Sequence, residues 1–108
     1  MGRITFLMNG AAGKMGRAMA TGLMQEDDLQ IVGAVDIKCA GQDIGSLCGM
    51  DAVGVKIEEN LTMVLEKTKP QVMVDFTNPQ AVMKNIRTAM EHKVAVVVGT
   101  TGLGEAEL

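Results

Sequence analysis

Three glycines and one acidic residue have the spacing expected of a site for a pyrophosphate and a ribose. The sequence Gly10-Ala-Ala-Gly13-Lys-Met-Gly16 follows an apolar run at residues 4–8, and Asp36 lies 20 positions beyond the last glycine. Glycine permits a tight reversal of the chain and a close approach of its backbone to a pyrophosphate, because no Cβ stands in the way. The free N–H groups and the positive dipole of a following helix attract the anion, while a carboxylate after the second strand accepts hydrogen bonds from the ribose. The pattern predicts a site for an adenine dinucleotide.

Each of these residues also has a purely structural interpretation. The glycine sequence could be a tight strand-to-helix connection without a ligand, and Asp36 could be a strand-end turn residue or a helix cap. Lys14 could contact a phosphate or only solvate one face of the helix, and for Arg17 we expect the second role alone. The strand before the glycines and the distance from Gly16 to Asp36 favour the dinucleotide interpretation.

Alternating strand-like and helix-like runs must position these residues. Strands are expected at residues 3–8, 29–35, 53–57, 72–76 and 94–98. All but one of these runs are largely apolar, as in strands that are buried on both faces of a parallel sheet. Residues 53–57 instead alternate apolar residues with Gly or Lys, which suits a strand nearer an edge.

Helices are expected at residues 14–26, 61–67 and 80–92, and Asn60 and Asn78 are suited to cap the last two of them. Spacings of three and four residues predict inward stripes on the first and third helices. The stripe residues are Met15, Met19 and Leu23 in the first, and Val82, Ile86, Ala89 and Met90 in the third. Residues 38–52 contain three glycines and little periodicity, which predicts a surface loop with one short helical turn.

This order of elements predicts an α/β fold of the Rossmann type over residues 1–108. We expect one domain with three layers (α/β/α), a doubly wound parallel sheet and the strand order 3-2-1-4-5. Ligands of such sheets bind beyond the carboxyl ends of the strands. Residues 10–15, Asp36, 75–77 and 99–102 all follow predicted strands, so they should form one site. Strand 94–98 would lie at an edge of the sheet, where bare apolar strands favour self-association.

Composition argues against several classes of function. Aromatic residues make up 2% of the 108 residues, with no Trp or Tyr, so base stacking on a nucleic acid is not expected. The net charge of −3 also argues against a polyanionic partner, and neither a secretory leader nor a membrane-spanning segment is recognisable. Cys39 and Cys48 lack the spacing of a zinc site and are expected to be reduced thiols of a cytoplasmic protein, without a metal.

Three motifs together resemble a known family. They are the glycine sequence at residues 10–16, Val74-Asp-Phe-Thr77 followed by Pro79, and Val98-Gly-Thr-Thr-Gly102. In this order and spacing they resemble dihydrodipicolinate reductase, over nearly the whole chain. The resemblance implies an oxidoreductase that uses NADH or NADPH to reduce hydroxy-tetrahydrodipicolinate, on the route to diaminopimelate and lysine.

The resemblance also implies roles for individual residues. It assigns the pyrophosphate to Gly10, Ala11, Ala12, Gly13, Lys14 and Met15, the adenosine ribose to Asp36, and the nicotinamide half of the cofactor to Phe76, Thr77, Gly99, Thr100 and Thr101. The chain departs from the family at Ala12, where many members have glycine, and at Ile37 and Lys38, where some members have arginine after the acidic residue. Asp36 repels a 2′-phosphate, whereas Lys38 and Lys14 attract it. We therefore expect both cofactors to be used, with a preference for NADH.

Catalytic residues are not expected in this chain. The family's substrate-binding and catalytic residues, a His-His pair with a nearby Lys and a Gly-Thr anchor, lie in a second domain, and His92 matches none of them. We therefore expect the chain to be a truncated cofactor domain without activity of its own, whose full-length protein is a homotetramer. Two alternatives remain: a stand-alone NAD(H)-binding or sensing module, and the cofactor domain of another two-domain dehydrogenase.

Overall fold

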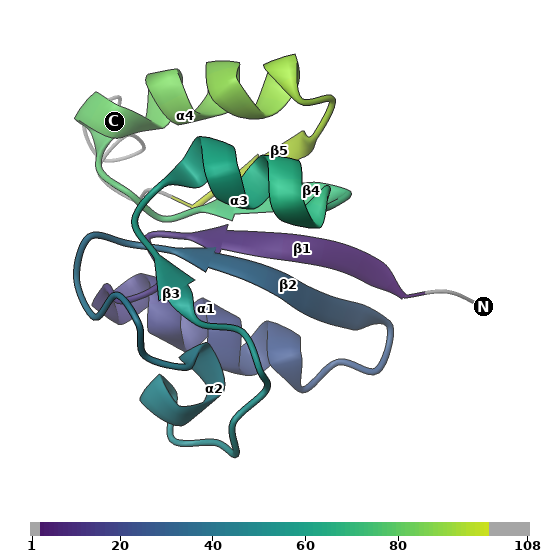
Figure 1. Cartoon of the computed structure of the whole chain (residues 1–108), viewed down its shortest axis with the longest axis vertical. Coiled ribbons are helices and arrows are strands. Elements are labelled where there is room, and N and C mark those ends of the chain that lie inside the picture. Colours follow the sequence, from purple (N-terminus) through teal and green to yellow (C-terminus); the bar gives the residue numbers. More distant parts are fainter. Residues whose placement is uncertain (1–2, 100–108) are drawn as a thin grey trace.

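Strands and helices alternate along the chain in a single parallel sheet with helices on both sides (Figure 1). The computed structural model describes residues 3–99. Its elements are β1 (Ile4–Asn9), α1 (Lys14–Met24), β2 (Leu29–Val35), α2 (Ile44–Leu47), β3 (Ile57–Glu58), α3 (Leu61–Thr68), β4 (Val72–Asp75), α4 (Pro79–Glu91) and β5 (Ala95–Val98). The sheet has the order β3-β2-β1-β4-β5, and all of its neighbouring strands are parallel, so the predicted Rossmann topology is confirmed.

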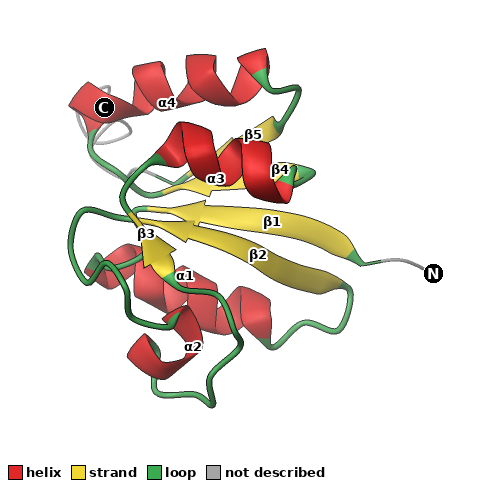
Figure 2. Ribbon diagram, in the orientation of Figure 1, coloured by secondary structure: helices red, strands yellow, loops and turns green. Residues whose placement is uncertain are grey.

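The sheet separates two apolar cores. Helices α1 and α2 cover one face and α3 and α4 cover the other, as Figure 2 shows. Alternate residues of β1 serve the two sides, because successive side chains of a strand point to opposite faces. Phe6 and Met8 belong to the core beneath α1 and α2, and Leu7 belongs to the core beneath α3 and α4. The continuous apolar run of β1 is thereby explained.

The strand predicted at 53–57 is shorter and later than expected, since β3 contains only Ile57–Glu58. The preceding residues use their backbone groups within the loop instead. The Val53 and Gly54 N–H groups donate to the carboxylate of Asp43 at 3.0 and 2.8 Å. These N–H groups are therefore unavailable to a β2–β3 ladder.

Asp43 organises the loop between β2 and β3. Its carboxylate also accepts hydrogen bonds from the Gly45 and Ser46 N–H groups at 2.8 and 3.2 Å, which caps α2. Desolvation raises the pKa of Asp43, but the hydrogen bonds from the four backbone N–H groups outweigh it, and the net pKa lies below the ordinary value of 3.8. Asp43 therefore closes the loop as a charged group.

The predicted surface loop at 38–52 is partly wrong. The short helical turn is confirmed as α2, but its first residue, Ile44, is fully buried and belongs to the core beneath α1. The Ile44 N–H donates to the Val55 carbonyl at 2.9 Å, which holds α2 against the segment that leads into β3. The segment is thus a packed part of the fold.

The predicted stripe on α1 is wrong for its two methionines. Met15 and Met19 are 51% and 40% exposed, whereas Gly16 and Ala20 are buried. Leu23 is half-buried and packs against the core. An α-helix advances about 100° per residue, so Leu23 shares a face with Gly16 and Ala20. Small residues on this face let α1 approach the sheet closely.

The stripe on α4 is confirmed for Val82 and Ala89, which are fully buried, and wrong for Met90, which is 67% exposed. Ile86 is half-buried. Met90 follows Val82 by eight residues, and eight steps of about 100° leave the two side chains about 80° apart around the helix axis. Met90 therefore points away from the core that Val82 enters.

Among residues 3–99, no helix has both the length and the apolar character needed to cross a membrane.

Candidate functional site

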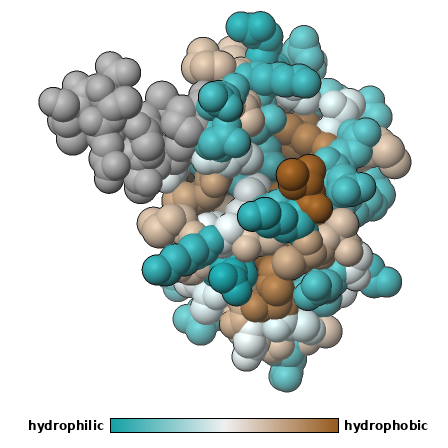
Figure 3. All heavy atoms as spheres, turned by 90° about the vertical axis from the view of Figure 1, so that its left-hand side faces the viewer, coloured by the Kyte–Doolittle hydropathy of each residue, from teal (hydrophilic) through white to brown (hydrophobic). Residues whose placement is uncertain are grey.

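A cleft of about 650 Å³ lies at the carboxyl ends of the strands. Figure 3 looks onto this edge of the molecule, where patches of apolar surface lie among hydrophilic side chains. The cleft is lined by Asn9, Gly10, Ala12, Gly13, Lys14, Val35, Asp36, Ile37, Lys38, Glu59, Leu61, Phe76, Thr77, Asn78, Ala81 and Asn85. These segments meet because parallel strands all end at the same edge of a sheet.

The glycines of the turn after β1 have different structural functions. Gly10 has φ +84°, and a Cβ there would lie 2.8 Å from the backbone carbonyl of Phe76. A Cβ on Gly16 would lie 2.0 Å from the Gly10 carbonyl oxygen, so α1 rests directly on the turn. Gly13 is exposed, and its Cβ would make only an ordinary contact at 3.5 Å. The first and third positions are thus required by the fold, and the middle position leaves the backbone accessible to a ligand.

Helix α1 begins directly after this accessible backbone. Gly13 is its N-cap residue, and in the part of the chain that the structure describes no side chain accepts a hydrogen bond there. The first N–H groups of a helix have no partner within the helix and carry the positive end of its dipole. The arrangement is suited to an anion such as a pyrophosphate.

The turns after the strands continue the hydrogen-bond ladder of the sheet. The Gly10 and Ala11 N–H groups both donate to the Val35 carbonyl, at 2.8 and 3.2 Å. The Phe76 N–H donates to the Asn9 carbonyl at 2.9 Å, and the Gly99 N–H donates to the Asp75 carbonyl at 2.8 Å. The backbone of the site is therefore held by hydrogen bonds of the same kind as those that hold the strands together.

Asp36 lies directly after β2 and is held in place through both carboxylate oxygens. Oδ2 accepts a hydrogen bond from the Ala12 N–H and Oδ1 accepts one from the Lys38 N–H, each at 2.9 Å. The side chain is half-buried and lines the cleft. The Asp36 carboxylate thus joins the glycine turn to the end of β2 and presents a negative charge to the cleft.

A buried carboxylate shapes the other side of the cleft. Asp75 is fully buried at the end of β4, where its Oδ1 accepts hydrogen bonds from the Thr77 N–H at 2.8 Å and from the Thr77 hydroxyl. The Asn9 side-chain amide donates to Asp75 Oδ2 at 3.3 Å, and the Asn85 amide donates to the Thr77 hydroxyl at 3.2 Å. The hydrogen bonds of Asp75 thus hold the Phe76-Thr77 turn in place.

Phe76 and Gly99 lie against each other. A Cβ on Gly99 would lie 2.2 Å from Cζ of the Phe76 ring, so only glycine leaves room for the ring in this position. The ring thereby connects the turn after β4 with the residue that follows β5. The expected proximity of these two segments is confirmed.

The structure brings most of the sequence-predicted site residues together. The cleft is lined by Gly10, Ala12, Gly13, Lys14, Asp36, Lys38, Phe76 and Thr77. Ala11 is fully buried in the core, Met15 is exposed on the first turn of α1, and Gly99 packs behind Phe76. Thr100 and Thr101 lie outside the described residues.

Eight residues that line the cleft were not predicted as site residues: Asn9, Val35, Ile37, Glu59, Leu61, Asn78, Ala81 and Asn85. Asn9 ends β1 and could have been found from the rule that ligands bind at strand ends. Glu59 follows β3, which ends one residue beyond the strand expected at 53–57, so the same rule could have indicated it. Among residues 3–99, no group of three or more His, Cys, Asp or Glu side chains could hold a metal ion.

Comparison with known proteins identifies close relatives. Residues 4–108 match the family described as "Dihydrodipicolinate reductase, N-terminus". The 4-hydroxy-tetrahydrodipicolinate reductase of Moorella thermoacetica is 49% identical over 100 residues, and that of Desulfitobacterium hafniense (strain DSM 10664 / DCB-2) is 43% identical over 109 residues. These alignments cover 93% and 100% of this chain but only 38% and 41% of the relatives.

Solved structures share the fold. Dipicolinate-bound dihydrodipicolinate reductase from Paenisporosarcina sp. TG-14 has a TM-score of 0.74 at 26% identity, covering 91% of this chain and 37% of that structure. An amine dehydrogenase from Mycobacterium smegmatis has a TM-score of 0.76 at 30% identity, and the match covers 88% of this chain and 29% of that structure. A Rex-family repressor, RSP, has a TM-score of 0.71, and the match covers 98% of this chain and 57% of that structure. At 11% identity this likeness shows the fold alone.

The chain thus spans about two fifths of the length of the curated relatives that it matches. The family match extends through the glycine turn, the carboxylate after β2 and the turn after β4, which are the segments that form the cleft. The chain belongs to the dihydrodipicolinate reductase family, of which it represents the N-terminal, nucleotide-binding region.

Proposed function

We propose that the cleft at the carboxyl ends of β1, β2 and β4 binds NADH or NADPH in an extended conformation. Gly10 to Met15, with the uncapped N-terminus of α1, would hold the pyrophosphate, and Asp36 would accept hydrogen bonds from the adenosine ribose. Phe76, Thr77 and Gly99 would face the nicotinamide half of the cofactor. The observation that carries this proposal is the position of Asp36, whose carboxylate is bound to the Ala12 N–H of the glycine turn itself.

The whole protein, on this proposal, reduces hydroxy-tetrahydrodipicolinate to tetrahydrodipicolinate. When bound, the nicotinamide would supply the hydride, and the substrate hydroxyl would leave with a proton as water. The residues of this chain orient the dinucleotide and exclude water from one side of it, while the substrate would be bound by the remainder of the protein. Residues 1–108 would then be a cofactor domain that binds dinucleotide but does not turn over substrate.

The family resemblance extends the proposal to assembly and location. We infer a homotetramer for the full-length protein, with contacts made outside this chain, which light scattering of that protein would test. We also infer a cytoplasmic location, because Cys39 and Cys48 are both free thiols and a reducing compartment keeps them so.

Calorimetric titration of the 108-residue chain with NADH and then NADPH tests the proposal. Binding in the micromolar to submillimolar range is expected for at least one of them. Replacement of Asp36 by Ala removes charge-assisted hydrogen bonds worth roughly 1.5–3 kcal/mol, which is about ten- to a hundredfold in NADH affinity. The loss for NADPH should be much smaller, because the same change removes repulsion of the 2′-phosphate.

The exposed Asp27, which lies before β2 at the other end of the sheet, provides a matched control. Asp27→Ala changes the net charge equally and should leave both affinities unchanged. Equal losses for NADH and NADPH in Asp36→Ala would contradict the ribose role. Absence of binding to the unaltered chain would contradict the proposal as a whole.

A further inference from the structure

One charged side chain of the cleft has no part in the site described so far. Glu59 is exposed in the short connection between β3 and α3, and it lines the cleft together with Asp36 and Lys38. Among residues 3–99, its carboxylate takes part in neither of the two salt bridges and in no hydrogen bond. Its charge therefore acts on whatever occupies the cleft.

Backbone pairing fixes Glu59 beside Asp36. Val35 and Glu58 are partners in the parallel pairing of β2 with β3, and the Asp36 N–H donates to the Glu58 carbonyl at 3.0 Å. Asp36 and Glu59 are the residues that directly follow Val35 in β2 and Glu58 in β3. Paired strands are about 5 Å apart, so the two carboxylates extend from neighbouring backbone positions.

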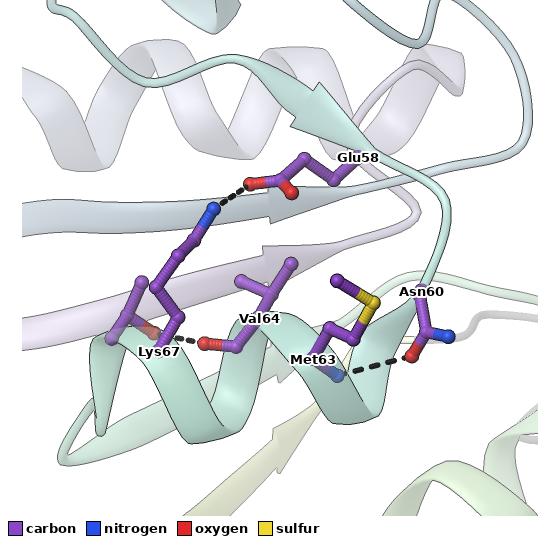
Figure 4. A network of polar contacts seen from close by, with 6 residues as sticks. Glu58, Asn60, Met63, Val64 and Lys67 are labelled. Carbon is purple, nitrogen blue, oxygen red and sulfur yellow. Dashed lines mark hydrogen bonds and ion pairs between the residues drawn. The ribbon is translucent and has the colours of Figure 1, made fainter.

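The residues on either side of Glu59 limit its movement. Glu58 forms an ion pair with Lys67 of α3 at 2.5 Å, and Asn60 caps the same helix by accepting a hydrogen bond from the Met63 N–H at 3.0 Å (Figure 4). Glu58 thus points toward α3, away from the cleft, and its charge is neutralised there. The backbone of Glu59 is thereby held between two anchored residues, at the edge of the cleft.

The charged groups of the cleft differ in how firmly they are held. Asp36 is fixed by two backbone N–H groups, whereas Lys14 and Lys38 are exposed and form no salt bridge among the described residues. Lysine carries its charge on a flexible four-carbon stem. Near the adenosine ribose, the fixed carboxylate of Asp36 and the carboxylate of Glu59, which extends from the neighbouring strand end, both oppose an added anion.

We propose that Glu59 determines cofactor selectivity by repelling the 2′-phosphate of NADPH. The inference rests on the proposed function, since it assumes that Asp36 binds the adenosine ribose. A 2′-phosphate carries a charge of about −1.5 to −2 at pH 7, and the ribose that bears it would lie against Asp36, next to Glu59. NADH lacks this group, so Glu59 hinders it far less.

The test is a pair of substitutions with the same change in charge. Glu59→Gln removes the carboxylate at the cleft, and Glu58→Gln removes the one that faces Lys67. Both cofactors are titrated into each variant and into the unaltered chain, at an ionic strength of about 0.01 M and again at about 1 M. Circular dichroism verifies that the variants are folded.

In Glu59→Gln, the ratio of NADPH to NADH affinity should rise about three- to tenfold at low salt, and most of the rise should disappear at high salt. Glu59→Lys should raise the ratio further, and Glu58→Gln should leave it unchanged. An unchanged ratio in Glu59→Gln, or equal rises in both glutamine variants, would overturn the role of Glu59 while leaving the proposed function intact. Failure of the unaltered chain to bind either cofactor would overturn both.

Discussion

Replacement of Gly16 by alanine tests the close contact between α1 and the glycine turn. The added Cβ would lie 2.0 Å from the Gly10 carbonyl oxygen and 2.9 Å from the carbonyl carbon. Both atoms belong to the backbone, so no side-chain rotation relieves the overlap. Either α1 moves away from the sheet or the turn changes its conformation.

The magnitude follows from two opposed effects. Alanine is favoured over glycine within a helix by about 1 kcal/mol. Overpacking of a tight contact typically costs about 1–3 kcal/mol, and a rigid backbone obstacle corresponds to the upper part of that range. We expect the free energy of unfolding to fall by about 2 kcal/mol, which lowers Tm by roughly 8–16 °C for a domain of this size.

Gly22 supplies the matched control, because it lies in the same helix and the Cβ of an alanine there would have nothing within 4 Å. Gly22→Ala should raise the free energy of unfolding by about 0.5–1 kcal/mol. Urea and thermal unfolding followed by circular dichroism measure both variants. If Gly16→Ala proved as stable as Gly22→Ala, the packing role assigned to Gly16 would be refuted.

Three further predictions concern other parts of the molecule. Asp43→Asn should lower the free energy of unfolding near neutral pH and make it depend less on pH, because the lowered pKa of Asp43 gives stability that is present above pH 3.8 and is lost as the pH falls through the lower folded value. Urea unfolding between about pH 2 and 7 measures this, and parallel pH profiles of the two proteins would contradict it. Gly99→Ala should destabilise the chain by displacing the Phe76 ring, and Phe76→Ala should remove most of that additional cost, as a double-mutant cycle measures; additive effects would contradict the contact. Val97, 55% exposed on β5, should promote self-association, so Val97→Lys should favour the monomer; light scattering that finds the unaltered chain monomeric at high concentration would refute this.

The topology could be predicted because it depends on signals that are local in the chain. Apolar runs marked β1, β2, β4 and β5, and glycines at Gly10 and Gly16 marked a turn whose conformation excludes a Cβ. The position of Asp36 then follows from the parallel arrangement alone, since the ends of β1 and β2 must be neighbours. The same reasoning correctly joined the turn after β4 to this edge.

The remaining features depend on packing that no local pattern records. Met15 and Met19 have an apolar spacing, yet the helix turns Gly16 and Ala20 inward because contact with the turn requires small residues. The length of β3 depends on Asp43, a distant residue that takes up the N–H groups of the predicted strand. Asn85 enters the cleft from a helix, and its position depends on how that helix packs on the sheet.

The extended ladder has a consequence for the entropy of ligand binding. The amide hydrogens of Gly10, Ala11, Phe76 and Gly99 donate to carbonyls of neighbouring strand ends, so they exchange with solvent only when those strands separate. Their exchange rates should resemble those of the central strands. A dinucleotide would then meet a backbone that is already ordered, and the entropy lost on association would come from the ligand and from side chains such as Lys38.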